Sequence, residues 1–260
     1  MDLGLTGKRA LVTGSSKGIG RAVAQALAQE GCHLELVARN RSLLEQVAES
    51  IQSECDVEVG IHAADLSETA EQSRIAEKCR DVSIVVNNAG ANPPGEIDEI
   101  GDPVWRAAWD LKVFGYINLT RHFYQHMKAR KSGVIVNVIG TSGERMQARY
   151  ILGSTGNIAL MGLTKALGAA STDYGVRVVG VNPGLTRTDR AEYMLKGWSE
   201  NAYGTPDRWR EFQGELNLPF GRMGEPTEVA DMVVFLASDR AAYVSGTVVT
   251  VDGGATNRNI

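Results

Sequence analysis

The stretch that decides the fold is Thr13-Gly14-Ser15-Ser16-Lys17-Gly18-Ile19-Gly20, which follows a β-branched run and opens an amphipathic stretch of helical length. Gly14 permits a tight turn, Gly18 lets backbone N–H groups approach a pyrophosphate, and Gly20 allows the helix to pack closely on the strand. An anion would then face the N-terminus of the helix. A glycine triple alone is a weak signal, but this position between a strand and a helix predicts a phosphate-binding loop.

Outward from this loop, short β-branched runs alternate with stretches of helical length. The predicted strands are Arg9–Thr13, His33–Ala38, Asp56–His62, Val82–Val86, Val134–Ile139, Val176–Val181 and Thr247–Val251. The predicted helices are Gly18–Glu30, Arg41–Ser53, Thr69–Arg80, Pro103–Arg130, Ile151–Asp173 and Pro226–Ser238. Strands separated by helices predict parallel pairing with right-handed crossovers. We therefore expect an α/β fold with one doubly wound parallel sheet, whose ligand binds at the carboxyl ends of the strands.

Length and composition indicate a single globular domain. The chain has 260 residues without a Pro/Gly/Ser linker, and undivided α/β domains often reach about 250 residues. Apolar residues make up 43% and charged residues 22% of the chain, so it can bury a full core without disulfides. With 27 Lys and Arg against 31 Asp and Glu, the net charge of −4 argues against a nucleic-acid partner.

The cysteines and the lengths of the apolar runs indicate in which cellular compartment the protein is expected. Cys32, Cys55 and Cys79 cannot all pair within the chain, and their spacing matches no metal template. We expect reduced thiols in a cytoplasmic protein without a metal site. The longest apolar runs are far shorter than the roughly 18 residues that suggest a membrane span, and the first residues contain no basic-then-apolar leader.

The segment from Leu185 to Phe220 is long for a connection and is expected to be irregular. It contains five aromatic residues within twenty positions, namely Tyr193, Trp198, Tyr203, Trp209 and Phe212. Two interpretations stay open. The aromatics form either a satellite core or subunit contact, or the apolar wall of a substrate site beneath a lid at about residues 185–220.

A second motif, Asn87-Asn88-Ala89-Gly90, follows the fourth predicted strand. With the T-G-x3-G-x-G pattern of residues 13–20, it resembles the fingerprints of the short-chain dehydrogenase/reductase family. The resemblance continues through Asn182-Pro183-Gly184, Gly221–Pro226 and Val251–Gly254 and covers essentially the whole chain, and the C-terminal third is especially similar to 3-oxoacyl-carrier-protein reductases. It implies a seven-stranded Rossmann sheet that binds NAD or NADP, usually in a homotetramer or homodimer.

The second strand ends in Val37-Ala38-Arg39-Asn40, without the acidic residue that would hydrogen-bond the ribose 2′-hydroxyl of NAD. Arg39 and Lys17 supply two cations instead, which favours the 2′-phosphate of NADP(H). By resemblance Asp65 binds the adenine amino group, although it is equally suited to cap the next helix. The expected cofactor-binding residues are Gly14, Ser15, Ser16, Lys17, Gly18, Ile19, Gly20, Arg39, Asp65, Asn88, Ala89, Gly90, Pro183, Gly184 and Thr188.

The resemblance fails at the catalytic positions. Members of the family use Asn, Ser, Tyr and Lys, with the Tyr and Lys in a Y-x3-K motif. Anchored on neighbouring motifs, those four positions fall on Lys112, Gly140, Gly153 and Asn157. None of the four expected residue types is in place.

A relocated catalytic set is one interpretation of these exchanges. Lys112 has replaced the Asn and Asn157 the Lys, and Tyr150 lies seven residues before Asn157, as in the Tyr-x6-Lys motif of the family's enoyl reductases. Thr141 or Ser142 could supply the hydroxyl lost at Gly140. A tyrosine is a poor base at neutral pH unless a cation lowers its pKa, and Lys112 is the candidate cation. The alternative is that Lys112, Tyr150 and Asn157 are ordinary surface or packing residues.

The sequence thus favours an NADP(H)-dependent oxidoreductase with a non-standard catalytic set, acting on a carbonyl or conjugated enone with an apolar body. The competing hypothesis is a catalytically depleted NADP(H)-binding protein that acts as a sensor or as the partner of an active homologue. A lyase on this scaffold is disfavoured, because the family's halide-releasing branch keeps the Ser and Tyr and gives up the glycine loop.

Overall fold

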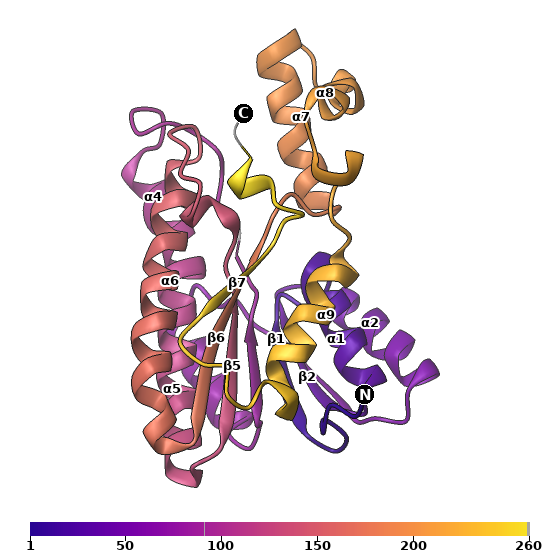
Figure 1. Ribbon diagram of the computed structural model, residues 1–260, viewed down its shortest axis with the longest axis vertical. Helices are drawn as coiled ribbons and strands as arrows, with labels where there is room; N and C mark the ends of the chain where they lie inside the picture. Colours follow the sequence, from indigo (N-terminus) through magenta and orange to yellow (C-terminus); the bar gives the residue numbers. More distant parts are fainter. Residues whose placement is uncertain (91, 259–260) are drawn as a thin grey trace.

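The computed structural model describes residues 1–90 and 92–258, which form one seven-stranded parallel sheet with helices on both faces (Figure 1). The strand order is β3-β2-β1-β4-β5-β6-β7. The strands are β1 (Arg9–Thr13), β2 (His33–Ala38), β3 (Val59–Ala63), β4 (Ile84–Asn87), β5 (Gly133–Val138), β6 (Val176–Pro183) and β7 (Val248–Val251). The order reverses direction between β1 and β4. The doubly wound sheet expected from the sequence is therefore confirmed, and its crevice lies at the carboxyl ends of these two strands.

Helices cover the sheet in two layers that bury opposite faces of each strand. They are α1 (Gly18–Gln29), α2 (Arg41–Glu54), α3 (Thr69–Lys78), α4 (Asp102–Trp109), α5 (Gly115–Arg130), α6 (Ile151–Ala170), α7 (Asp189–Tyr203), α8 (Trp209–Glu215) and α9 (Pro226–Ala237). In β1, Ala10 and Val12 pack with α1, α2 and α9, whereas Leu11 packs with α3 and α5. This alternation is what a strand buried on both faces requires. No helix of the described residues is long and apolar enough to cross a membrane.

One predicted helix is interrupted. The sequence predicts a continuous helix over Pro103–Arg130, but a π-helical turn at Asp110–Phe114 separates α4 from α5. Lys112 and Val113, inside this turn, are buried. A π-helical turn adds a residue to the ring closed by each hydrogen bond, and such turns often occur at functional sites.

The segment at about residues 185–220 was expected to be irregular, and this expectation is wrong, because it contains α7 and α8. Thr188 starts α7 as a cap, its Oγ1 accepting a hydrogen bond from the Ala191 N–H at 3.2 Å. In Figure 1, α7 and α8 project beyond the carboxyl end of the sheet. That this segment closes over a substrate as a lid stays a prediction.

Most of the aromatic residues of this segment pack on one another. Trp198, Trp209 and Phe212 surround a small buried cluster that includes Leu195. The Tyr203 and Phe212 ring centroids are 6.0 Å apart. These rings therefore pack as a satellite core would, and Trp209 also lines a cavity, so both interpretations of the aromatics stay open. Tyr193, by contrast, is 61% exposed.

A buried threonine joins the carboxyl ends of β1 and β4. The Oγ1 of Thr13 accepts hydrogen bonds from the backbone N–H groups of Asn88 at 2.8 Å and Ala89 at 3.0 Å. It also donates to the carbonyl of Val86 at 3.3 Å. This one hydroxyl fixes the motif after β4 against the start of the glycine loop.

The Thr13→Val variant should lower the free energy of unfolding by about 1–3 kcal/mol, because two backbone N–H groups lose their acceptor. Denaturant unfolding measures the change. Thr13→Ser is the matched control, since it keeps the hydroxyl, and it should retain most of the stability. Equal stability of the valine and serine variants would contradict this role of Thr13.

Candidate active site

The glycine loop leaves the end of β1 in a conformation that side chains would obstruct. Gly14 and Gly18 have φ angles of +66° and +57°, a region that favours glycine. At Gly20 a Cβ atom would lie 2.3 Å from the Gly14 carbonyl oxygen and 2.4 Å from Nδ2 of Asn88. The loop can take this path only without a side chain at Gly20, which is the close packing predicted from the sequence.

The other residues of the loop are held against β2. The Gly14 N–H donates to the Val37 carbonyl at 2.7 Å, and the Ser15 side chain is buried beside the same carbonyl. Ser16 and Ile19 are half-buried, and Lys17 is exposed. The N-terminus of α1 is thus presented at the sheet crevice with open backbone, as a phosphate site requires.

Two residues expected at the adenosine end lie near each other. Ser67 donates its backbone N–H at 3.0 Å and its hydroxyl at 2.7 Å to Oδ1 of Asp65. These bonds, together with the charge of Arg39, lower the pKa of Asp65 against the opposing effect of burial. The alternative role of Asp65 as a helix cap is wrong, because Glu68 occupies the N-cap position of α3. Arg39 is exposed at the end of β2.

Residues that follow β6 contact the glycine loop. A Cβ at Gly18 would lie 3.2 Å from Cγ2 of Thr188. Lys17 Nζ is 3.8 Å from Oδ2 of Asp189. Pro183 ends β6, and the Gly184 N–H donates to the carbonyl of Val251 at 2.9 Å. The structure therefore gathers the expected phosphate-binding residues around one helix N-terminus.

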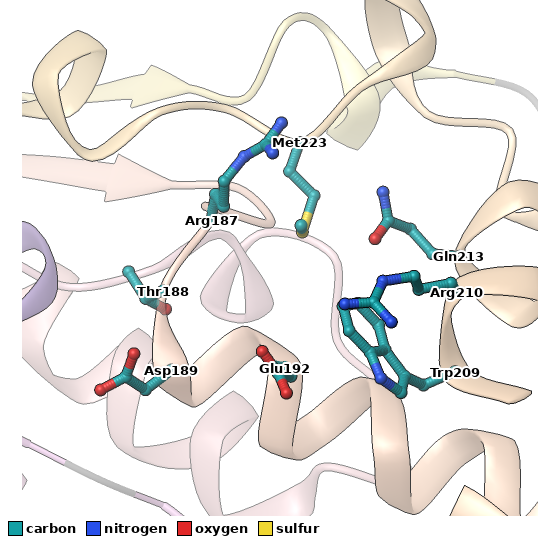
Figure 2. Close-up of a pocket in the computed structure, with 8 residues that line it drawn as sticks. All are labelled: Arg187, Thr188, Asp189, Glu192, Trp209, Arg210, Gln213 and Met223. Carbon is teal, nitrogen blue, oxygen red and sulfur yellow. The ribbon is translucent and has the colours of Figure 1, made fainter. Parts of the chain in front are cut away.

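A cavity of about 510 Å³ lies between α7 and α8 (Figure 2). Its lining residues are Arg187, Thr188, Asp189, Glu192, Trp209, Arg210, Gln213 and Met223. A second cavity of about 360 Å³ shares residues 187–189 and extends to α1. Neither cavity is lined by Lys112, Tyr150 or Asn157. Both hollows are thus lined by Thr188, an expected cofactor-binding residue, and the second also reaches Gly18 of the glycine loop.

The side-chain amide of Asn157 connects the two positions that the sequence analysis assigned to the family Lys and Ser, which are residues 157 and 140. Nδ2 of Asn157 donates to Oγ of Ser142 at 2.8 Å and lies 3.2 Å from the Gly140 carbonyl oxygen. Asn157 is buried, and its Oδ1 has no partner among the described residues. Gly140 adopts a φ of +130°, and Thr141 begins the short helical turn that contains Ser142. Ser142 therefore supplies a hydroxyl beside the position where the family serine is lost.

Lys112 points into the protein and not into solvent. Its Nζ donates to Oη of Tyr116 at 2.9 Å and to the carbonyl of Val138 at 2.8 Å, and it is only 7% exposed. The carbon stem lies over Gly90, where a Cβ would be 2.3 Å from Cδ of Lys112. Burial lowers the pKa of Lys112 to about 7. At neutral pH the amine is thus divided between charged and uncharged forms.

Tyr150 covers Gly153, the position that the sequence analysis assigned to the family tyrosine. A Cβ at Gly153 would lie 1.9 Å from Cε1 of Tyr150, so the ring occupies the space of any side chain there. Arg190 of α7 hydrogen-bonds to the backbone carbonyl of Asn92. Burial raises the pKa of Tyr150, and the guanidinium of Arg190 and the side chain of Asn92 beside the phenol oppose that rise.

The predicted catalytic residues therefore fall into separate groups. Asn157 and Ser142 are brought together, but no hydrogen bond between described residues joins Lys112 to Tyr150. The cation beside the phenol is Arg190, where the sequence interpretation assigned Lys112. Convergence of Lys112 and Tyr150 on a bound nicotinamide stays a prediction.

Sequence reasoning missed three neighbours of these groups. Tyr116 stands four residues after Lys112 on a predicted helix, a spacing that places both on one face and could have identified the pair. Asn92 reaches Tyr150 from the loop after β4, and Arg190 reaches it from the first turn of α7. No local spacing signals that approach, because it depends on how the three segments fold together.

Known proteins resemble this chain over its whole length. The short chain dehydrogenase family matches residues 8–197. The chain is 31% identical to 2,3-dihydro-2,3-dihydroxybenzoate dehydrogenase of Bacillus subtilis (strain 168), covering 97% of both chains. It is 30% identical to the 3-oxoacyl-[acyl-carrier-protein] reductase FabG of Thermotoga maritima, covering 96% of this chain and 98% of that protein.

Among solved structures, the L-sorbose reductase of Gluconobacter frateurii, complexed with NADPH and L-sorbose, matches with a TM-score of 0.92. The two proteins are 32% identical, and the match covers 100% of both chains. The family match, the whole-length relatives and the glycine loop at the crevice of this sheet together show that the chain belongs to the short-chain dehydrogenase/reductase family.

Proposed function

We propose that this protein is an NADP(H)-dependent oxidoreductase with a non-standard catalytic set, acting on a carbonyl or conjugated enone with an apolar body. The observation that carries the proposal is the glycine loop after β1, which we call the cradle. There Gly20 lies too close to the Gly14 carbonyl and to Asn88 to admit a side chain. Such a loop serves the approach of a pyrophosphate to backbone N–H groups. The protein therefore keeps the part of the family site that binds the cofactor.

The cofactor is assigned by the charges at its adenosine end. Arg39 is exposed at the end of β2 near Asp65, and Lys17 is exposed in the loop. Guanidinium and ammonium groups suit the 2′-phosphate that distinguishes NADPH from NADH. The L-sorbose reductase that resembles this chain is complexed with NADPH. When bound, NADPH supplies the hydride.

The proton is assigned to Tyr150. Because burial raises the pKa of Tyr150, its phenol stays protonated at neutral pH and is suited to donate a proton to a substrate oxygen. Arg190, beside the phenol, stabilises the phenolate that forms. Asn157 with Ser142, and Thr141 next to it, would hold the substrate oxygen. In its charged form Lys112 would add an ammonium below Gly90.

Three exposed apolar side chains support a substrate with an apolar body. Ile97, Met146 and Tyr193 are 67%, 61% and 61% exposed. They belong to the segments after β4, β5 and β6 that also carry Asn92, Tyr150 and Arg190. Tyr193 lies beside Arg190, whose guanidinium carbon is 5.5 Å from the centre of the tyrosine ring, and exposed apolar side chains next to polar ones are typical of ligand sites. They extend the proposed apolar wall beyond the half-buried aromatics of residues 185–220, of which Trp209 lines the larger of the two cavities.

The second candidate is a cofactor-binding protein without hydride transfer, which acts as a sensor or as the partner of an active homologue. The observation that favours it is Gly153, because the phenol of the family Y-x3-K motif is missing there and the ring of Tyr150 fills its space. Tight NADPH binding without turnover of any tested carbonyl would favour this candidate.

NADPH should bind more tightly than NADH, and Arg39→Asp should reverse the preference, since the new carboxylate repels the 2′-phosphate and accepts from the 2′-hydroxyl. Titration of nucleotide fluorescence measures both affinities. Equal affinities for NADPH and NADH in the unmodified protein would exclude the proposed binding of the 2′-phosphate by Arg39 and Lys17.

The proposed pyrophosphate site at the cradle can be tested separately from the charges of Arg39 and Lys17. Gly20→Ala should lower the affinity for both nucleotides at least about tenfold, because the new methyl group would clash with the Gly14 carbonyl and Asn88. Gly162→Ala is the matched control, since a Cβ there meets nothing within 4 Å. An unchanged affinity in Gly20→Ala would remove the proposed pyrophosphate site.

Tyr150→Phe should lower turnover of small enones or apolar ketones by about 10²–10⁴-fold if proton transfer limits the rate. Lys112→Ala should also lower turnover, and the double variant should lose much less than the product of the single losses, because the groups act on one transition state. Both variants should still bind NADPH. Rates are normalised to the fraction of protein that binds the cofactor.

The pH dependence of the turnover rate distinguishes the role of Lys112 from that of Tyr150. Because the pKa of Lys112 is about 7, a rate that needs its ammonium falls as the pH rises through about 7, and Lys112→Arg should abolish that fall. A packing role for Lys112 or Tyr150 predicts instead a lower melting temperature with nearly unchanged turnover per folded molecule. Unchanged turnover in both single variants would eliminate the relocated set.

A homodimer or homotetramer is expected through the helices α4, α5 and α6. Val104, Phe114 and Ile158 are 47%, 47% and 44% exposed on α4, the π-helical turn and α6, which pack together. Covering such side chains is what a symmetric interface achieves. Light scattering at micromolar concentration should give a multiple of the chain mass. A monomeric mass would refute the interface.

A further inference from the structure

A carboxylate, an imidazole and a thiol meet between β2, β3 and the end of α3. Nε2 of His62 lies 2.6 Å from Oε2 of Glu35 and 3.5 Å from Sγ of Cys79. These side chains each offer one ligand atom, and the three atoms all lie within 4.8 Å of one another. His62 and Cys79 are buried, and Glu35 is half-buried. None of the three belongs to the cradle or to the predicted catalytic set, so the proposed reduction does not use them.

A glycine within β3 makes room for the carboxylate. Gly60 lies opposite Glu35 in the register of β2 and β3. A Cβ atom at Gly60 would lie 2.2 Å from Oε2 of Glu35, so the carboxylate occupies the space of any side chain there. Glycine weakens the interior of a strand and often marks such a close approach. The residue at position 60 therefore permits the carboxylate to reach His62.

Arg9 holds the other oxygen of this carboxylate and connects it to the surface. Its Nη1 donates to Oε1 of Glu35 at 2.9 Å, which leaves Oε2 turned toward His62. Carboxylates that bind a metal are commonly held by such an outer hydrogen bond. Arg9 also pairs with Glu58 at 2.5 Å and Asp81 at 3.5 Å, so its positive charge is shared among three carboxylates. The side chains of Arg9 and Glu35 are 26% and 14% exposed, which opens the carboxylate to ions from solvent.

The donor atoms select the class of ligand. An imidazole nitrogen, a sulfur and a carboxylate oxygen are donors that Zn²⁺ accepts together, whereas Mg²⁺ and Ca²⁺ take oxygen donors. Nδ1 of His62 has no partner among the residues that the structure describes. No hydrogen bond there fixes which ring nitrogen is protonated, so Nε2 can present its lone pair to a cation. Burial raises the pKa of the Cys79 thiol to about 12, so the cation has to bind sulfur strongly enough to displace that proton.

We propose that Glu35, His62 and Cys79 bind one divalent ion of the zinc type through Oε2, Nε2 and Sγ. Zinc sites with three protein ligands complete the tetrahedron with water. The thiol proton passes to solvent as the metal–sulfur bond forms. The expectation of a protein without a metal site rested on the spacing of the cysteines, which cannot reveal ligands from three elements that meet only in the folded chain. This binding goes beyond the proposed hydride transfer, and no step of that reaction depends on it.

Cobalt titration tests the proposal on the full chain, kept reduced by a phosphine and without nucleotide. Co²⁺ is the probe, because it takes the same ligands as Zn²⁺ and absorbs in the near ultraviolet when a thiolate binds it. The unmodified chain should gain this absorption up to about one equivalent of Co²⁺, and Zn²⁺ should remove it. Zn²⁺ should also raise the melting temperature, since an ion that binds only the folded chain stabilises it.

Cys79→Ser removes the sulfur with little change in size, and Cys55→Ser, at the half-buried end of α2, is the matched control. The cobalt absorption should be lost in Cys79→Ser and unchanged in Cys55→Ser. Glu35→Gln should weaken Co²⁺ binding at least about tenfold, because it removes the anionic ligand and keeps the shape. Circular dichroism shows which variants fold, and Glu35→Gln decides if Cys79→Ser does not.

Three results would overturn the proposal: no thiolate–cobalt absorption in the unmodified chain, the same absorption in folded Cys79→Ser, or unchanged Co²⁺ affinity in Glu35→Gln. The cluster would then be only a hydrogen-bonded part of the core. The titration needs no NADPH, so its failure leaves the proposed reduction standing, and loss of turnover leaves the cobalt result standing.

Discussion

The meeting of β1 and β4 at their carboxyl ends is the constraint on which the site depends. One hydroxyl, that of Thr13, binds the two N–H groups after β4, and the Asn88 side chain returns a hydrogen bond to the Thr13 carbonyl at 2.9 Å. These contacts leave no space for a side chain at Gly20. The glycine loop, the helix N-terminus and the motif after β4 therefore share one geometry, and a displacement of either strand would alter all three.

Around this fixed cradle, the residues predicted to stand at the family's catalytic positions do not form one pair. Lys112 turns inward to Tyr116, while Asn157 binds Ser142. The phenol of Tyr150 reaches the empty position at Gly153 from an adjacent turn, and its neighbouring cation comes from α7. Two phenols thus each lie beside a basic side chain, Tyr116 beside Lys112 and Tyr150 beside Arg190.

Much of the fold could be predicted because it rests on local signals. Buried parallel strands are continuous apolar runs, and the glycines after β1 are dictated by the turn itself. The helices of residues 185–220 escaped prediction because their aromatic side chains were interpreted as features of an irregular lid, whereas Trp198, Trp209 and Phe212 pack around one small cluster. The π-helical turn and the approach of Arg190 to Tyr150 escaped for another reason. Each depends on contacts between elements that are distant in the sequence.

Arg190 lies in the first turn of α7, between the loop that carries Asn92 and the phenol of Tyr150. In the proposed reduction, the segment predicted to select the substrate would also carry the charge beside the proton donor, so a change in this segment would affect specificity and acidity together. An insertion or deletion in the first turn of α7 would therefore change both at once.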